Sequence, residues 1–144
     1  MNTIIVPQTK TASLLELTAP YDNPYQGDTA RVLFVCSVGL LRSPTAAAYF
    51  SGQGYNTRSC GSSVGMALIP ISANLIEWAH QIVFMRYENK RGTLALFQES
   101  DTVRDAIERK SVVFGIEDDF NYMQPELISE LESCKHKLIS VSRS

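Results

Sequence analysis

Apolar residues form short, dense runs from about position 31 onward, and stretches with helical spacing separate these runs. A run such as Val32-Leu33-Phe34-Val35 is typical of a strand that is buried on both faces of a sheet. The pattern predicts four strands, at 32–35, 57–60, 81–85 and 111–114. It also predicts five helices, at 43–50, 72–80, 88–97, 101–109 and 125–139. Because strands and helices alternate, we expect a single α/β domain whose four-stranded parallel sheet carries helices on both faces.

The first 30 residues depart from this pattern. They contain Pro7, Pro20 and Pro24 and a run of turn-forming residues at 21–28. We therefore expect residues 1–30 to form an irregular N-terminal arm and residues 31–144 to form the domain. The first residues lack the basic and apolar regions of a signal peptide, and no apolar run approaches the roughly 20 residues that span a bilayer.

Composition and charge exclude several classes of partner. Apolar residues make up 44% of the chain and its net charge is −2, so no basic field favours nucleic acid or an acidic membrane surface. The three cysteines, Cys36, Cys60 and Cys134, are too few and too scattered for a disulfide framework, which indicates the reducing cytoplasm. His80 and His136 share no ligand spacing with them, so we expect neither a metal nor a cofactor.

The segment from Cys36 to Ser43 carries the clearest chemical signal. Cys36 follows the first predicted strand directly, Arg42 stands six positions later, and Ser43-Pro44 suits the start of a helix. Ligands of parallel α/β sheets bind beyond the carboxyl ends of the strands, where this segment lies. The context, more than the spacing of cysteine and arginine, predicts a phosphate-binding loop.

Physical chemistry explains why a phosphate site needs these residue types. A tight loop can turn several backbone N–H groups toward one anion, and the following helix adds its own N–H groups and its dipole. Arg42 can hold two phosphate oxygens in a bidentate fork. The positive environment favours the thiolate of Cys36, to which the Ser43 hydroxyl can donate, and that thiolate can attack a bound phosphoryl group to form a phosphocysteine. The loop residues that would supply N–H groups are Ser37, Val38, Gly39, Leu40 and Leu41.

The leaving group of such a reaction needs an acid beside the loop. Three acidic residues, Glu117, Asp118 and Asp119, follow the fourth predicted strand and so belong to the same edge of the sheet as Cys36. A solvated turn would have the same composition, and only the phosphate loop makes this cluster the leading source of the acid.

Residues 32–36 and 42–46 together resemble the signature of the low-molecular-weight protein tyrosine phosphatases. The resemblance extends over about residues 31–135 and is closest to a short predicted-phosphatase branch, with counterparts at 77–79, 82–85 and 118–127. It implies a nucleophile at Cys36, a phosphate-binding Arg42 and a supporting Ser43. It also implies a general acid at Asp118, because Phe120 then takes the aromatic position that usually follows the acid.

The resemblance implies a protein tyrosine phosphatase that acts on phosphorylated proteins or small aryl phosphates. Two alternatives stay open. The family usually has glycine and then asparagine where this chain has Val38-Gly39, which suggests a phosphate-binding module with little turnover. A related arsenate reductase uses the same loop with further cysteines, and Cys60 or Cys134 would have to supply that thiol; we rank this function below the phosphatase.

Overall fold

The computed structural model describes residues 29–38, 42–117 and 119–142. Most of the predicted arm therefore lies outside the described residues. So do four of the predicted site residues, Gly39, Leu40, Leu41 and Asp118. The chain before the first strand is fixed at Thr29, which forms an antiparallel bridge with Ser142, and at Ala30, whose N–H donates to the carbonyl of Val141 over 2.7 Å.

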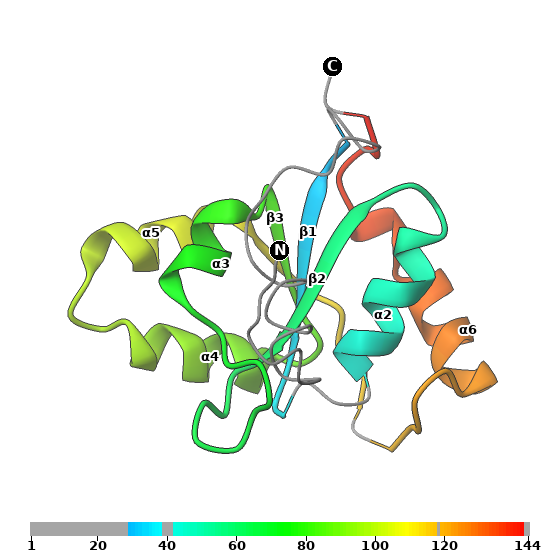
Figure 1. Ribbon diagram of the computed structural model, residues 1–144, viewed down its shortest axis with the longest axis horizontal. Coiled ribbons are helices and arrows are strands. Elements are labelled where there is room, and N and C mark those ends of the chain that lie inside the picture. The colour runs from blue at the N-terminus through cyan, green and yellow to red at the C-terminus, as the bar shows by residue number, and fades with distance from the viewer. Residues whose placement is uncertain (1–28, 39–41, 118, 143–144) are drawn as a thin grey trace, which may run out of the picture.

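The four predicted strands form one parallel sheet with the order β2-β1-β3-β4 (Figure 1). Their bounds are Arg31–Cys36 for β1, Asn56–Gly61 for β2, Gln81–Phe84 for β3 and Ser111–Val113 for β4. Strand β1 is central, and its residues from Val32 to Cys36 are all buried, as the continuous apolar run predicts. Its last residues align with the ends of both neighbours, since Val35 pairs with Cys60 and with Phe84.

Helices cover both faces of this sheet, as expected (Figure 1). Helices α2 (Arg42–Ser51) and α6 (Pro125–Ser133) lie on one face. Helices α3 (Ala73–Trp78), α4 (Tyr87–Leu96) and α5 (Asp101–Lys110) lie on the other. None of the helices in the described part of the chain has the length and apolar character needed to cross a membrane.

Two hydrophobic cores separate the sheet from its helices. On the α2 and α6 face, the rings of Phe34 and Phe50 stack with centroids 5.7 Å apart, and Phe114 meets Phe34 edge-on at 6.3 Å. On the other face, Leu33 and Ile107 are among the fully buried side chains. Since residues of β1 alternate between the cores, Cys36 belongs to the α2 and α6 face.

The closing helix is shorter than predicted. The spacing of apolar residues indicates a helix to 139, but α6 ends at Ser133 and a 3-10 turn follows over Lys135–Lys137. Beyond this turn, the side chain of Gln81 donates to the carbonyl of Lys137 over 3.0 Å and accepts from the N–H of Ile139 over 3.0 Å. These backbone groups thus bond to β3 instead of continuing a helical ladder. Because Ile139 still packs against the core, the apolar spacing alone does not reveal the change.

Candidate active site

Cys36 is the last residue of the central strand, and its side chain is 3% exposed. Its sulfur lies 3.1 Å from the hydroxyl oxygen of Ser43, which is fully buried in the first turn of α2. The same hydroxyl donates to the carbonyl of Cys60 in β2 over 3.3 Å. The structure therefore brings the predicted nucleophile and its predicted supporting serine together, and the hydroxyl joins them to the neighbouring strand.

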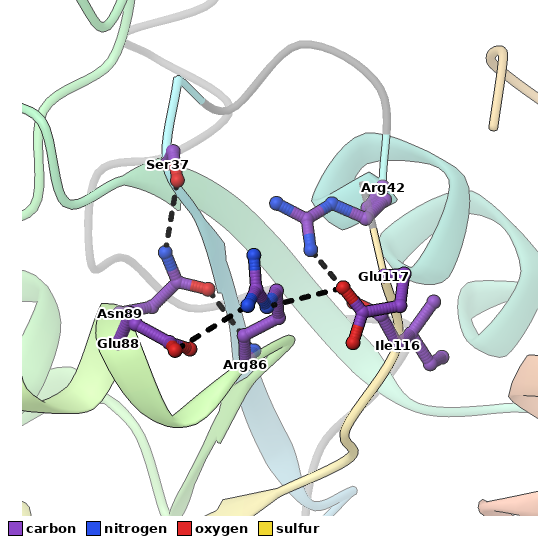
Figure 2. A network of polar contacts seen from close by, with 7 residues as sticks. All are labelled: Ser37, Arg42, Arg86, Glu88, Asn89, Ile116 and Glu117. Carbon is purple, nitrogen blue, oxygen red and sulfur yellow. Dashed lines mark hydrogen bonds and ion pairs between the residues drawn. The ribbon is translucent and has the colours of Figure 1, made fainter. Parts of the chain in front are cut away.

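Arg42 is the first residue of α2 and is 2% exposed. A guanidinium so deeply buried needs hydrogen-bond acceptors around it. Its Nη1 donates to the carbonyl of Ile116 over 2.7 Å, as Figure 2 shows. Ile116 lies in the segment after β4, so Arg42 links the helix after the loop to the region of the predicted acid. The arginine is thus held at the sheet edge and does not turn out to solvent.

The first residues of the loop are held by the segment that follows β2. The N–H groups of Ser62 and Ser63 donate to the carbonyls of Cys36 and Ser37 over 2.9 and 2.8 Å. Gly61 lets the two segments approach this closely. A Cβ at position 61 would lie 2.7 Å from the carbonyl carbon of Val38 and 2.8 Å from the carbonyl oxygen of Ser37, closer than real Cβ atoms come. The sequence pattern shows Gly61 only as the start of a loop.

Helix α4 contributes a contact that the sequence analysis missed. The side-chain amide of Asn89 donates to the hydroxyl of Ser37 over 3.1 Å and to the hydroxyl of Ser62 over 3.3 Å. Asn89 is 3% exposed and lies in the first helix after β3, at the same edge of the sheet as Cys36. In the sequence it stands among charged residues at a helix start, where an exposed side chain is the usual outcome.

Arg86 forms an ion-pair link across the mouth of the site. Its guanidinium lies 3.3 Å from the carboxylate of Glu88 and 3.6 Å from that of Glu117 (Figure 2). These side chains are partly exposed, so solvent weakens the pairs to a modest contribution. The arrangement nevertheless brings two arginines, Arg42 and Arg86, to the same short segment, residues 116–117, from different elements.

The segment after β4 contains a left-handed residue, Gly115, with φ 78°. Glycine reaches that conformation without the steric cost that other residues meet. Ile116 is then buried, whereas Glu117 and Asp119 are exposed. Phe120 packs against the core on the α2 face, and Tyr122 is 53% exposed. The described part of this segment thus follows the expected edge of the sheet, while Asp118 lies outside the described residues.

The positions of the other two cysteines do not favour a disulfide with Cys36. Cys60 pairs with Val35 and belongs to the core on the opposite face from Cys36. Because Cβ vectors that point to opposite faces cannot be bridged without moving the backbone, this placement argues against a Cys36–Cys60 disulfide. Burial raises the pKa of Cys60 well above its usual value, and Cys36 raises it further. Cys134 is buried in the core, as predicted, and burial raises its pKa too.

The fold is that of the low-molecular-weight protein tyrosine phosphatases, and solved structures of this class superpose on most of the chain. The Streptococcus pyogenes low-molecular-weight protein tyrosine phosphatase SP-PTP is 15% identical with a TM-score of 0.57, covering 78% of this chain and 95% of its own. The tyrosine phosphatase Wzb from Escherichia coli K30, in complex with phosphate, is 14% identical with a TM-score of 0.55, covering 76% and 95%.

A third similar structure is a cysteine-to-serine mutant of the YwlE arginine phosphatase with a phosphorylated active-site serine. It is 22% identical with a TM-score of 0.52, covering 74% of this chain and 94% of its own. No protein-family model and no curated protein matches the sequence. At these identities the comparisons establish the fold, and the chemistry has to be argued from the residues of this chain.

Proposed function

We propose that this protein is a cysteine-dependent phosphatase that hydrolyses phosphomonoesters, with phosphotyrosine as its substrate. The observation that carries the proposal is the 3.1 Å contact between the Cys36 sulfur and the Ser43 hydroxyl at the end of the central strand. Arg42 begins the same helix turn and is anchored on the segment after β4. A nucleophile, a hydroxyl donor and a phosphate-binding cation therefore converge on one edge of the sheet.

The proposed reaction has two steps on the Cys36 sulfur. In the first, the thiolate attacks phosphorus, the S–P bond forms, and the P–O bond to the leaving group breaks as Asp118 donates a proton to that oxygen. In the second, Asp118 takes a proton from water, the water oxygen attacks phosphorus, and the S–P bond breaks to release phosphate and thiolate. The phosphorylated serine in the YwlE mutant supports a phosphoenzyme at the equivalent position.

Arg42 and the backbone N–H groups of residues 37–41 would bind the phosphoryl oxygens and stabilise the charge that moves onto them in the transition state. The Ser43 hydroxyl has one proton, which it donates to the carbonyl of Cys60 in the structure. It would turn that proton to the sulfur when the sulfur leaves phosphorus as a thiolate.

No disulfide joins the three cysteines, which fits the reducing cytoplasm in which we place the protein.

The choice of phosphotyrosine depends on the rim of the site. Tyr87 opens α4 and is 59% exposed, and Tyr122 is 53% exposed in the segment after β4. Exposed aromatic rings at a phosphate site favour an aromatic leaving group, with which they can stack. Since one similar structure is an arginine phosphatase, phosphoarginine is the competing substrate, and both phosphorylated residues belong in the same assay.

The test is turnover of an aryl phosphate by the wild type and by Cys36→Ser. We expect Cys36→Ser to have no measurable turnover. It should still bind inorganic phosphate, and calorimetry would measure that binding. Cys134→Ala is the matched control, because it removes a buried thiol that the mechanism does not use. Unchanged turnover in Cys36→Ser would refute the assignment, and a wild type that binds phosphate without any turnover would identify a phosphate-binding module instead.

A further inference from the structure

We infer that Asn89 of α4 is a positioning residue that holds the start of the phosphate loop in its binding conformation. The expected effect of Asn89 on turnover rests on the function proposed above, whereas its expected effect on phosphate binding does not. The inference starts from an unusual placement: the amide side chain of Asn89 is 3% exposed, whereas its neighbours on the helix, Glu88 and Lys90, lie nearer to solvent and form ion pairs.

The orientation of this amide is fixed by its partners. Its Oδ1 accepts from the backbone N–H of Arg86 over 3.0 Å, and an N–H group can only donate. The nitrogen must therefore face the other way, where it donates to the hydroxyl oxygen of Ser37 over 3.1 Å (Figure 2). It also donates to the hydroxyl oxygen of Ser62 over 3.3 Å. The amide nitrogen of Asn89 thus donates to two serines beside Cys36, while its amide oxygen accepts from the N-cap residue of its own helix.

The two serines connect this amide to the nucleophile. Ser37 directly follows Cys36, and its carbonyl accepts from Ser63 over 2.8 Å. Ser62 donates to the carbonyl of Cys36 from its N–H over 2.9 Å and from its hydroxyl over 3.5 Å. A shift of either serine would therefore move the peptide groups on both sides of position 37.

Because the Asn89 side chain is buried, losing these hydrogen bonds costs more free energy than it would at the surface. A buried amide that loses its partners pays the full cost of desolvation, so the native arrangement strongly favours serine hydroxyls at this distance. A loop that must present several N–H groups to one anion works best when it is already ordered before the anion arrives, because ordering it afterwards reduces the affinity. Asn89 supplies that order from α4, outside the loop itself.

The experiment measures binding of inorganic phosphate to the full chain by calorimetry, alongside kcat and KM with an aryl phosphate. We expect Asn89→Ala to weaken phosphate binding by about tenfold, as for the loss of one or two buried hydrogen bonds, and to raise KM more than it lowers kcat. If Asn89→Ala does not fold, Asn89→Ser keeps a polar group on the helix but is too short to reach both serines.

Two comparisons separate positioning from general destabilisation. Thr93→Val removes another buried hydrogen bond of α4, from Thr93 Oγ1 to the carbonyl of Asn89 over 2.8 Å, without removing the amide. We expect it to lower the melting temperature but to leave phosphate binding unchanged. In a double-mutant cycle, adding Ser37→Ala to Asn89→Ala should weaken binding less than the two separate effects predict, because both remove the same bond.

Phosphate affinity in Asn89→Ala that equals that of the wild type, or that falls only as far as in Thr93→Val, would overturn the inference. A wild type that binds phosphate but has no turnover would instead refute the proposed function, and the ratio of phosphate affinities would still decide the role of Asn89. The two failures are therefore distinguishable in one set of measurements.

Discussion

The guanidinium of Arg42 donates a 2.7 Å hydrogen bond to the backbone carbonyl of Ile116, and so this arginine is fixed by the segment that carries Glu117 and Asp119. Arg42 comes from the start of α2, and Ile116 from beyond the edge strand β4. One bond thus spans the carboxyl edge of the sheet from the centre to its far side.

Arg42→Lys should lower kcat/KM by about two to three orders of magnitude, as is typical when an oriented donor to the transition state is lost. Lysine keeps the charge, but a single ammonium group cannot hold the Ile116 carbonyl and two phosphate oxygens at once. Steady-state kinetics with an aryl phosphate would measure the loss. Arg86→Lys is the control at the same edge, where the ion pairs are partly exposed. Equal activity in the two variants would contradict this role for Arg42.

Gly61→Ala should destabilise the protein by about 1–3 kcal/mol and weaken phosphate binding. The added Cβ would lie 2.6 Å from the Cβ of Ala67 and closer than 3 Å to backbone atoms of Ser37 and Val38, so the start of the loop must shift. Gly92→Ala is the matched control, because a Cβ there meets nothing within 4 Å in the middle of α4.

The two glycine variants should differ in sign. Gly92→Ala should stabilise the protein by up to about 1 kcal/mol, the usual gain from replacing glycine inside an exposed helix. Urea unfolding would measure both free energies, and a phosphate titration would measure the site. A Gly61→Ala protein with wild-type phosphate affinity would show that the contact between residues 61 and 37–38 does not control the loop.

Asp118→Asn should slow substrates with poor leaving groups far more than those with good leaving groups, because only the former need a proton as the P–O bond breaks. A series of aryl phosphates with graded leaving-group acidity would show a steeper dependence in the variant than in the wild type. Asp119→Asn, at an exposed neighbouring position, should leave this dependence unchanged. The reverse result would assign the acid to Asp119.

The buried thiol of Cys60 should make the protein less stable in alkali. Burial raises the pKa of Cys60 well above its usual value, and the nearby Cys36 raises it further. The native state therefore keeps a proton that the unfolded chain releases. Stability is then complete below the unfolded pKa of about 8.5 and falls as pH rises above it, by at most about 1.4 kcal/mol per pH unit.

Urea unfolding at several pH values between about 7.5 and 9.5 would measure this decline, a window that brackets the unfolded cysteine. Cys60→Ala should flatten the slope without abolishing it, since burial also raises the pKa of Cys134. A slope in Cys60→Ala as steep as in the wild type would assign the alkaline loss of stability to other groups.

The sequence predicts the sheet and the position of Cys36 at the end of its first strand because both depend on local signals. The apolar run of β1 is buried throughout, and Arg42-Ser43-Pro44 does begin a helix. The predicted continuation of α6 to 139 is wrong, since Lys137 and Ile139 bond to Gln81, a residue more than fifty positions away, which local spacing does not reveal. Apolar spacing reports which face is buried, and that face persists through the 3-10 turn.

Asn89 and Gly61 were missed for a related reason. Their roles depend on which segments the fold brings together, namely α4, the loop after β1 and the segment after β2. A polar residue among charged neighbours and a glycine after a strand have ordinary local interpretations. The signal that could have identified them is their position, because Gly61 ends β2 and Asn89 follows β3, at the edge of the sheet where we expect the site.

The opposite orientation of Cys36 and Cys60 has a consequence for oxidative damage. Peroxide that reaches the nucleophile would convert it to sulfenic acid, and the thiol of the adjoining strand points away, on the far side of the sheet. Cys60 therefore cannot act as a resolving thiol for the oxidised sulfur unless the backbone of the two strands moves.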